Sequence, residues 1–365
     1  MISALPLLLA FTTDKILPLD SLALPSGYKI EVVAQAPNVR QLALAKDGTL
    51  FGGSRKAGKV YGFIDANKDG IYENTIIIAN KLNMPSGIAI NDNDLYVAEV
   101  SRILQYKEVL PLNRSASPNT YKAETYYSEL PNKRHHGWKY LKFGPKGDIF
   151  FNIGAPCNTC LPAFPFASIA KLDADKNLTL VAEGVRNSVG FAWHPQTQQL
   201  WFTENGRDYL GDDKPSDELN RISSPKQHFG FPFFHAHSIS DPQYSDPART
   251  SDQFTEPTYA LGAHVAPLGM TFINKTIEGA LAPEADEQTL LIAEHGSWNR
   301  SKKVGYKVVR LSIRNNEVIQ HENFITGWLQ DETHWGRPND IIQDTDGSLL
   351  ISDDYAGVIY RVSKQ

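Results

Sequence analysis

The sequence lacks the features that would place it among membrane, nucleic-acid-binding or disulfide-rich proteins. Its 365 residues contain only two cysteines and no basic run, and the formal net charge is -5. A modest negative charge without clustered Lys or Arg argues against nucleic acid or an anionic membrane as the main partner. The apolar run at residues 2–11 is too short to cross a bilayer, so we expect no membrane span.

That apolar run resembles the hydrophobic region of a secretory signal peptide, although no Lys or Arg precedes it. We therefore expect residues 1–22 to be a candidate signal or leader segment and the protein to be periplasmic or secreted. A disordered or strand-like leader, or a truncated gene start, is the alternative. Residues 23–365 contain no linker of biased composition, so we expect them to form a single domain.

The two cysteines, Cys157 and Cys160, form one C-x-x-C pair. A structural zinc site needs a second pair, and a redox C-x-x-C normally opens a helix. Pro156 and Pro162 flank this pair, which is typical of a loop. We expect a local disulfide, with free thiols, a metal site or a redox site as alternatives.

What the chain does contain is one pattern of short alternating strands, repeated six times. The first run of each repeat reads QLALA, GIAI, GWKYLKF, NSVGFAWHP, LGMTFI and PNDIIQ. The second run reads TLFGG, DLYVAEV, DIFFNIG, QLWFTENG, LLIAEHG and LLISDD, and a third strand follows each of these. Period-2 strands at this spacing, without helical periodicity, predict an all-β fold, a six-bladed β-propeller. We expect N- and C-terminal strands, residues 29–35 and 358–362, to close one blade.

The propeller fixes which residues can meet. Residues just before the innermost strand of a blade, and those just after its second strand, lie at the same end of the central channel. The longest non-repeating stretch, residues 228–266, is rich in aromatics, and we expect it to form an ordered wall over that channel mouth.

Positive charge is predicted at the channel mouth. Arg186 and Arg337 precede innermost strands, and Arg300 and Lys302 follow a second strand. Several guanidinium groups on one face suit a ligand with more than one carboxylate or phosphate. The alternative is that each arginine pairs with a neighbouring acid such as Asp354 and ties blades together.

Histidines also fall at channel-mouth positions. His135 and His136 precede the strand WKYLKF, and His295 follows LLIAE. A neutral imidazole is suited to accept an alcohol proton, although a lone histidine is more often a packing residue. Because neighbouring residues of an extended segment alternate faces, we expect His135 to point away from His136.

Two segments carry oxygen ligands suited to calcium. The Asp65 loop begins like a calcium-binding loop but has Ile76 at the twelfth position, so we expect a plain turn or a weak site. Residues 204–208, followed by the acidic residues of 212–218, offer backbone carbonyls beside a glycine and carboxylates close by. We expect calcium near this second loop.

These motifs resemble the soluble glucose/sorbosone dehydrogenase family, which are β-propellers dependent on pyrroloquinoline quinone (PQQ), and in particular its sorbosone-dehydrogenase-type branch. The resemblance covers most of the chain after about residue 130, in family order, and only generic blades before it. It is carried by HHGWKYLKFGPKGDIFFNIGAPCNTC, GVRNSVGFAWHP, LWFTENGRDYLGDDKPSDELNRI, HFGFP, HVAPLGMTF, EHGSWNRSKKVGYKVVRL, TGWL and RPNDIIQDTDGSLLISDD.

The resemblance implies PQQ- and calcium-dependent oxidation of a sugar, sugar aldehyde or other alcohol. The electron acceptor, a cytochrome or a quinone, is not specified by the sequence. His136 corresponds to the general base. The residues implied at the cofactor are Arg186, Asn187, Asn205, His295, Trp298, Arg300, Arg337 and Asp353. Those implied at the metal are Gly206, Arg207, Asp217 and Glu218.

The chain departs from the family pattern at three places. His135 competes with His136 for the role of base. Lys139 and Tyr140 stand where the family often has Gly or Arg-Ser, and Arg207 stands where the glucose enzymes have Pro. The last difference leaves backbone coordination of calcium open to this chain but does not specify the substrate.

Two other functions stay open. A calcium-dependent lactonase or hydrolase would need carboxylates to dominate the central face, and Glu99, Glu204, Glu294 and Asp353 are its candidates. A non-catalytic propeller that binds protein partners would need none of the Arg and His residues at the channel mouth.

Overall fold

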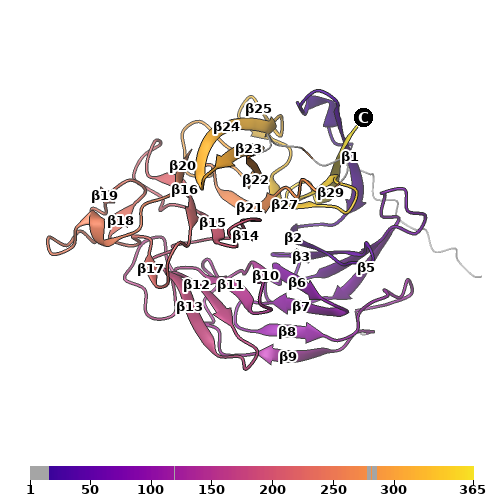
Figure 1. Ribbon diagram of the computed structural model, residues 1–365. Helices are drawn as coiled ribbons and strands as arrows, with labels where there is room; N and C mark the ends of the chain where they lie inside the picture. The colour runs from indigo at the N-terminus through magenta and orange to yellow at the C-terminus, as the bar shows by residue number, and fades with distance from the viewer. Residues whose placement is uncertain (1–15, 119, 278–280, 282–285) are drawn as a thin grey trace, which may run out of the picture.

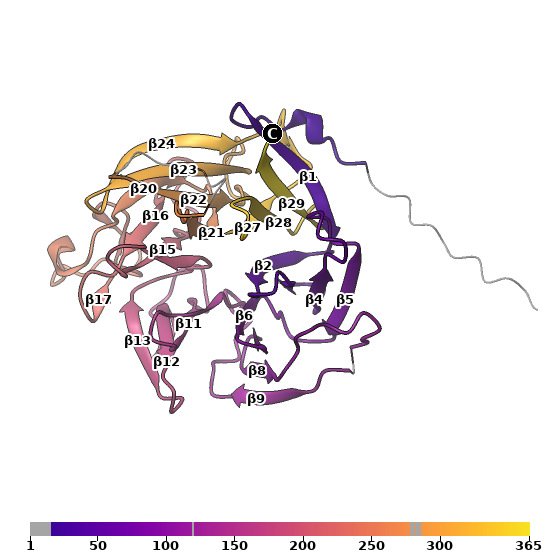
Figure 2. The same cartoon turned by 45° about the vertical axis from the view of Figure 1, so that its right-hand side comes forward.

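The computed structural model describes residues 16–118, 120–277, 281 and 286–365. The described chain folds almost entirely into short antiparallel strands, arranged as six small sheets around a central axis (Figures 1 and 2). The expected six-bladed propeller is confirmed. The only helical segments in these residues are two single turns of 3-10 helix, Leu19–Ser21 and Ser251–Gln253.

Each blade runs from an innermost strand at the channel to an outer strand at the rim. The first blade consists of β2 (Val39–Leu44), β3 (Leu50–Ser54), β4 (Val60–Ile64) and β5 (Asn74–Ala79). The second consists of β6 (Gly87–Asn91), β7 (Asp94–Ala98), β8 (Ile103–Tyr106) and β9 (Ala123–Tyr127). The third consists of β10 (Leu141–Phe143), β11 (Ile149–Ile153), β12 (Ser168–Leu172) and β13 (Leu178–Glu183), extended by β17 (Gln227–His228).

The remaining blades follow the same order. The fourth consists of β14 (Phe191–Trp193), β15 (Leu200–Glu204), β16 (Ser216–Arg221) and β20 (Tyr259–Ala263). The fifth consists of β21 (Pro267–Phe272), β22 (Gln288–Glu294), β23 (Lys307–Arg314) and β24 (Glu317–Ile325). The sixth consists of β27 (Pro338–Gln343), β28 (Leu349–Asp353), β29 (Val358–Lys364) and β1 (Tyr28–Gln35). Two small hairpins complete the strands: β18 (Phe234–His235) with β19 (Ile239–Ser240), and β25 (Leu329–Gln330) with β26 (Thr333–His334).

The second strand of each blade explains why the sequence reads there as a continuous apolar run. Every residue of β11, β15, β22 and β28 is buried, because each of these strands is covered on both faces by neighbouring blades. The outer strand β24 instead mixes exposed and buried residues, as a strand at the rim should. Burial between blades therefore supplies most of the hydrophobic core.

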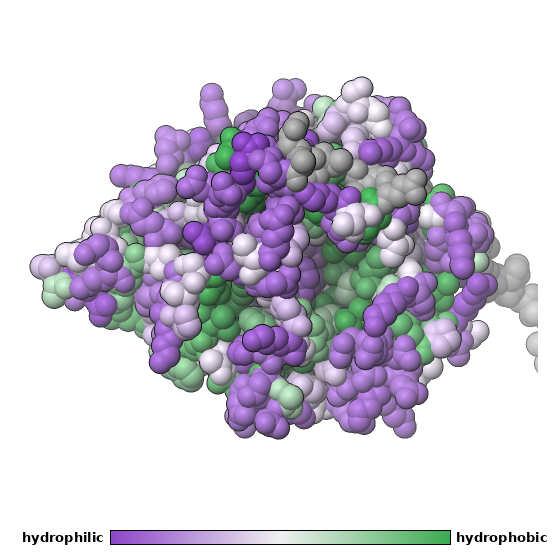
Figure 3. Space-filling model, in the orientation of Figure 1, coloured by the Kyte–Doolittle hydropathy of each residue, from purple (hydrophilic) through white to green (hydrophobic). Residues whose placement is uncertain are grey.

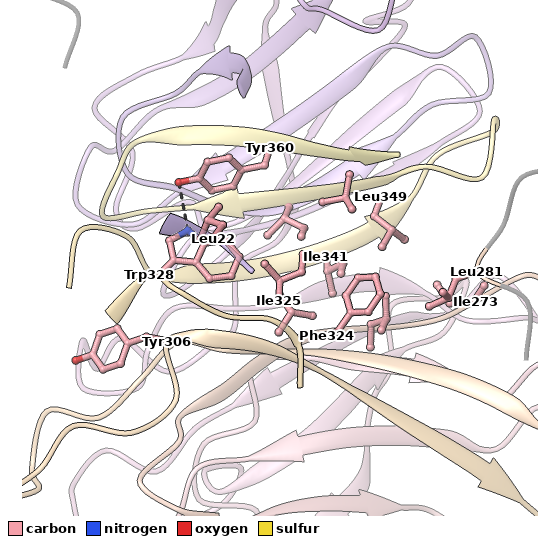
Figure 4. Close-up of a cluster of buried hydrophobic side chains, with 14 of the residues drawn as sticks. Leu22, Ile273, Leu281, Tyr306, Phe324, Ile325, Trp328, Ile341, Leu349 and Tyr360 are labelled. Carbon is pink, nitrogen blue, oxygen red and sulfur yellow. Dashed lines mark hydrogen bonds between the residues drawn. The ribbon is translucent and has the colours of Figure 1, made fainter. Parts of the chain in front are cut away.

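The terminal strands close the ring as expected. β1 pairs antiparallel with β29, in a register that runs from Tyr28 opposite Lys364 to Gln35 opposite Val358. The apolar cluster beneath this junction contains Tyr360, Trp328 and Ile341, and it joins the fifth and sixth blades (Figure 4). Tyr360 donates a hydrogen bond to Asp353 Oδ2 at 3.0 Å and accepts one from Trp328 Nε1 at 3.4 Å.

The stretch 228–266 does not form the expected wall over the channel mouth. Of its residues only His264 and Ala266 line the central cavity described below. Its aromatic side chains pack on one another instead, with Phe254 in contact with the rings of both Phe233 and Phe234. The aromatic content therefore marks a small local core beside the third and fourth blades.

Two further expectations concern covalent and membrane features. Cys157 and Cys160 are joined by a disulfide, as expected. No helix in the described part of the chain has the length and apolar character needed to cross a membrane. Most of the predicted leader, residues 1–15, lies outside the described residues, whereas Leu22 packs against the propeller.

The closing junction predicts a specific pattern of stability. Tyr360→Ala should lower the free energy of unfolding by about 3–5 kcal/mol, because it empties a fully buried ring site. Tyr360→Phe keeps the ring and should cost only about 1–3 kcal/mol, since it leaves Asp353 Oδ2 without the tyrosine donor. Urea denaturation of the two variants measures both values. Equal effects would show that the hydrogen bond, and not the packing, dominates at this junction.

Candidate functional site

One end of the central channel opens into a cavity of about 380 Å³. Its lining comes from segments just before innermost strands, such as Arg186 before β14, and just after second strands, such as His295 after β22. Five arginines and four histidines line it: Arg40, Arg55, Arg134, Arg186, Arg337, His135, His136, His264 and His295. Among the described residues only two carboxylate side chains, Asp208 and Asp217, join them. The cavity is therefore a cationic site.

Hydrophilic side chains cover most of the face shown in Figure 3, and apolar groups are visible mainly in the hollows between them.

Two arginines of the cavity are held in place by protein oxygens. Arg186 donates to Asn158 Oδ1 and O at 2.8 Å each and to Asn205 O at 3.0 Å, and it lies 3.3 Å from Asp208 Oδ2. Arg337 donates to the carbonyls of His295, at 2.9 Å, and Gly296. Each guanidinium group thus connects two loops, and both residues line the cavity.

Arg55 is held differently. Its guanidinium stacks 3.7 Å from the ring centre of Trp138, and its buried Nε has no hydrogen-bond partner among the described residues. Burial lowers the pKa of Arg55 to about 10, and the positive charge of Arg40 acts in the same direction. A cation in this position favours an anion that enters the cavity.

His136 has the geometry of a base. Its side chain is 8 % exposed, and Nδ1 lies 2.9 Å from the carbonyl oxygen of Ala155. A carbonyl can only accept, so Nδ1 carries the proton and Nε2 keeps its lone pair. Burial, followed by the charge of Arg186, holds the pKa of His136 well below 6.5, so the ring is neutral at pH 7.

The expectation that His135 points away from His136 is wrong. Both rings line the cavity, and their centroids are 4.2 Å apart. The alternation rule fails because this segment is a turn and not a strand, with His136 in the left-handed region at φ 47°. Burial also lowers the pKa of His135 below its usual value.

A second histidine is oriented by an acid. His295 Nε2 lies 2.6 Å from Asp354 Oδ1, and the other oxygen of Asp354 accepts from Arg40 at 2.8 Å. Burial lowers the pKa of His295 to about 4, so the neutral ring donates Nε2–H to the carboxylate. The hydrogen-bonded series Arg40–Asp354–His295 therefore connects the first, sixth and fifth blades.

The loop after β15 presents main-chain oxygens. Asp217 accepts hydrogen bonds from the backbone N–H groups of Gly206 and Ala266 at 2.8 Å each, which fixes the loop. No hydrogen bond among the described residues ends on the carbonyl oxygens of Gly206 or Arg207. Burial raises the pKa of Asp217 to about 6. Free carbonyls beside a fixed carboxylate are the ligand types that calcium prefers.

Of the residues predicted at the cofactor, Arg186, Asn187, Asn205, His295, Trp298 and Arg337 line the cavity, whereas Arg300 and Asp353 do not. Asp353 is fully buried and accepts from the backbone N–H groups of Arg337, Tyr355 and Ala356. Arg300 bonds to Asp212 and Asp213 at the rim.

Of the residues predicted at the metal, Gly206 and Asp217 line the cavity. Glu218 is the next residue along β16, so its side chain points to the opposite face, where it accepts from Ala236 N and Asn220. The Arg207 side chain turns away from the cavity to the buried Asp241 at 2.5 Å, so only the main chain of Arg207 is available to the loop.

Four further lining residues were not predicted from the sequence: Arg40, Arg55, Arg134 and Trp138. Asp208 and His264 also line the cavity, and they come from segments that were expected near the channel mouth. Arg55 could have been found, because it follows the second run TLFGGS and so obeys the positional rule for the channel mouth. Arg134 and Trp138 stand beside the histidine pair in an irregular segment, where no strand pattern predicts the direction of a side chain.

The Asp65 loop forms a turn, as expected. Asp65 accepts from the backbone N–H groups of Lys68, Asp69 and Gly70. The carboxylates of Asp65, Asp69 and Glu73 approach one another within 4.8 Å. These residues are absent from the lining of the central cavity.

Comparisons with known proteins agree with the fold. Residues 233–365 match the model of a family described as TrAA12-like. A calcium structure of a Trichoderma reesei carbohydrate-active enzyme of family AA12 is similar at a TM-score of 0.80 and 19% identity, over 97% of this chain and all of that one. The holo form of the pyranose dehydrogenase PQQ domain of Coprinopsis cinerea has a TM-score of 0.76 and 19% identity, over 94% and 97%.

At these identities the two solved structures show a common fold. The sequence relationship is stronger with a Borreliella burgdorferi protein described as uncharacterized. That protein is 36% identical over 356 residues, which cover 94% of this chain and 91% of the relative. The chain belongs to the same family as this Borreliella burgdorferi protein.

Proposed function

We propose that this protein is an oxidoreductase that uses PQQ and calcium to oxidise the hydroxyl group of a sugar, a sugar aldehyde or a related alcohol. The observation that carries the proposal is the cavity itself, where arginines from several blades surround the free Nε2 of a neutral histidine. The Coprinopsis cinerea structure named for PQQ and the Trichoderma reesei structure named for calcium support it. The sorbosone-type branch stays a prediction.

The side chains present fit a flat tricarboxylated quinone. Guanidinium groups bind carboxylates through charge-assisted hydrogen bonds, and the cavity offers five of them. Two buried polar atoms in its wall, Asn187 Oδ1 and Arg55 Nε, have no partner within the described part of the chain. Such atoms cost free energy unless a bound group satisfies them. Arg55, Arg186 and Arg337 would hold the carboxylates.

Calcium fits the loop of Gly206. The carbonyls of Gly206 and Arg207 would supply two main-chain oxygens, and Asp217 keeps this loop in place. When bound, the quinone would accept the hydride that the substrate carbon loses, and calcium would polarise the quinone carbonyl.

His136 would carry the acid–base part of the reaction. Its Nε2 lone pair would accept the proton of the substrate hydroxyl, while the Nδ1–H bond to Ala155 keeps the ring in the required tautomer. Its low pKa keeps the base unprotonated at neutral pH. His135 stays the alternative base because it lies in the same wall.

The lactonase or hydrolase alternative is less well supported. Glu204 and Asp353 are buried within the blades, Glu99 pairs with Arg102, and none of the four candidate carboxylates lines the cavity. The cavity is dominated by arginines instead.

The disulfide between Cys157 and Cys160 supports an oxidising compartment, in keeping with periplasmic or secreted location.

Arg55 gives a test of cofactor binding. Because its charge has no carboxylate partner among the ion pairs of the described residues, Arg55→Ala should weaken PQQ binding about 10-fold or more. Lys56→Ala removes a neighbouring exposed charge and should leave the affinity unchanged. Fluorescence titration of the calcium-loaded chain with PQQ measures both. Arg186→Ala should also weaken binding, but with loss of stability, since it releases Asn158 and Asn205.

The base is tested by turnover and pH. His136→Ala should lower kcat by about 10²–10⁴-fold while PQQ binding stays nearly intact, and His135→Ala should do much less. In the wild type, kcat/KM should fall as the pH drops through a pKa below 6.5, because protonation removes the lone pair. Steady-state kinetics between pH 4 and 8 measures this decrease of kcat/KM. The reverse ranking of the variants would assign the base to His135.

Removal of calcium tests the metal. Exhaustive chelation should abolish activity, and calcium should restore it more effectively than magnesium. Calcium should also raise the Tm of the chelated protein, because it binds only the folded loop. Asp217→Asn should reduce that Tm shift, since a weaker acceptor fixes the loop less firmly. Full activity after chelation would exclude a catalytic metal.

A further inference from the structure

Two exposed aromatic side chains stand at the mouth of the cavity. Tyr209 is 65% and Trp298 is 67% exposed. They come from adjacent blades, Tyr209 from the loop between β15 and β16, and Trp298 from the loop between β22 and β23. Their rings meet edge to face, with centroids 5.9 Å apart. Large aromatic surfaces that remain in water beside a cavity are typical of binding sites.

Hydrogen bonds and an ion pair join the two loops. Arg300 Nη1 donates to the Asp212 carbonyl at 2.6 Å, and Nη2 donates to Asp213 at 3.2 Å. The backbone N–H of Ser301 donates to Asp212 Oδ1 at 3.1 Å. Tyr209 itself has φ 69°, a left-handed conformation that is uncommon for a residue of this size. The ring is thus held at the rim by its surroundings, against its local backbone preference.

The Tyr209–Trp298 pair lies at a depression beside the central cavity. Tyr209 and Trp298, together with Asp212, Asn299 and Ser301, line a depression of about 460 Å³. Trp298 also lines the central cavity, so the two spaces share a wall. The depression combines aromatic faces with short polar side chains. A sugar ring has the complementary surface, with C–H groups on its faces and hydroxyls at its edge.

The charges of the depression exclude a second polyanion. The one guanidinium in its lining, Arg300, is already paired with Asp213, and Asp212 adds a second carboxylate. The central cavity is the cationic space and the rim depression is not. A neutral, hydroxyl-rich ligand matches the rim better than another copy of the cofactor.

We propose that Tyr209 and Trp298 form a subsite for a second sugar ring of the substrate. The inference rests on the proposed function and names its substrate class, an oligosaccharide whose reacting unit enters the central cavity. The second ring stacks on the aromatic pair while its hydroxyls bond to Asp212, Asn299 and Ser301. Arg300 is then a positioning residue, which keeps the two loops together.

Binding is measured first, without cofactor. The full chain is titrated with cellobiose, maltose and glucose by calorimetry and by tryptophan fluorescence, since Trp298 is the one exposed tryptophan of the six. At least one disaccharide should bind more tightly than glucose. Tyr209→Ala should weaken that binding about tenfold, and Tyr209→Phe should preserve most of it. Ile319→Ala, an exposed apolar site on β24, is the off-site control.

Activity gives the second measurement. In the protein loaded with PQQ and calcium, Tyr209→Ala should lower kcat/KM for the disaccharide about tenfold relative to kcat/KM for glucose. Equal losses for both sugars, a change confined to the KM of the electron acceptor, or no disaccharide binding by the wild type would overturn the subsite. If the loaded protein oxidises no sugar but the Tyr209-dependent binding holds, the proposed function fails and the subsite stands.

Discussion

The pairing of β1 with β29 is the interaction on which the rest of the structure depends. No single blade forms the cavity. Its lining comes from loops and strand ends of several blades, and these meet only in a closed ring. The chain of Arg40, Asp354 and His295 makes this dependence concrete, because its members come from the first, sixth and fifth blades. Stability at the closing junction, where Tyr360 and Trp328 pack, therefore translates directly into geometry at the channel mouth.

Positive charge is concentrated at the channel mouth, and hydrogen bonds to the arginines hold the surrounding loops in place. Three of the four side-chain hydrogen bonds of Arg186 and both of those of Arg337 go to carbonyl or amide oxygens, and Arg40 is neutralised by Asp354. Such contacts fix the direction of each guanidinium without neutralising the whole cavity, since carbonyls carry no net charge. Arg55 is the exception, held by the face of Trp138. The site is preorganised for a polyanion because Arg55, Arg186 and Arg337 are already held in place.

Much of the fold, and about half of the cavity wall, could be predicted from the sequence. Strand period and repeat order were sufficient for the blades, and the rule for loop positions led to Arg186, His136, His295 and Arg337. The rule fails where backbone direction is irregular. His135 shares the wall because His136 adopts a positive φ, which no alternation pattern contains. Arg300 follows a second strand as the rule requires, yet the longer loop carries it past the mouth to Asp212.

In the proposed reaction, the arginines would also link cofactor binding to acid–base chemistry. Burial is the main reason that the pKa of His136 is low, and the charge of Arg186 is the next. A bound tricarboxylate would offset part of that positive charge, so it would move the pKa of His136 back toward its ordinary value. The base would then be a stronger proton acceptor with the cofactor present than without it. In the proposed reaction the same guanidinium groups would hold the anionic cofactor and, before it binds, contribute to the low pKa that keeps His136 neutral.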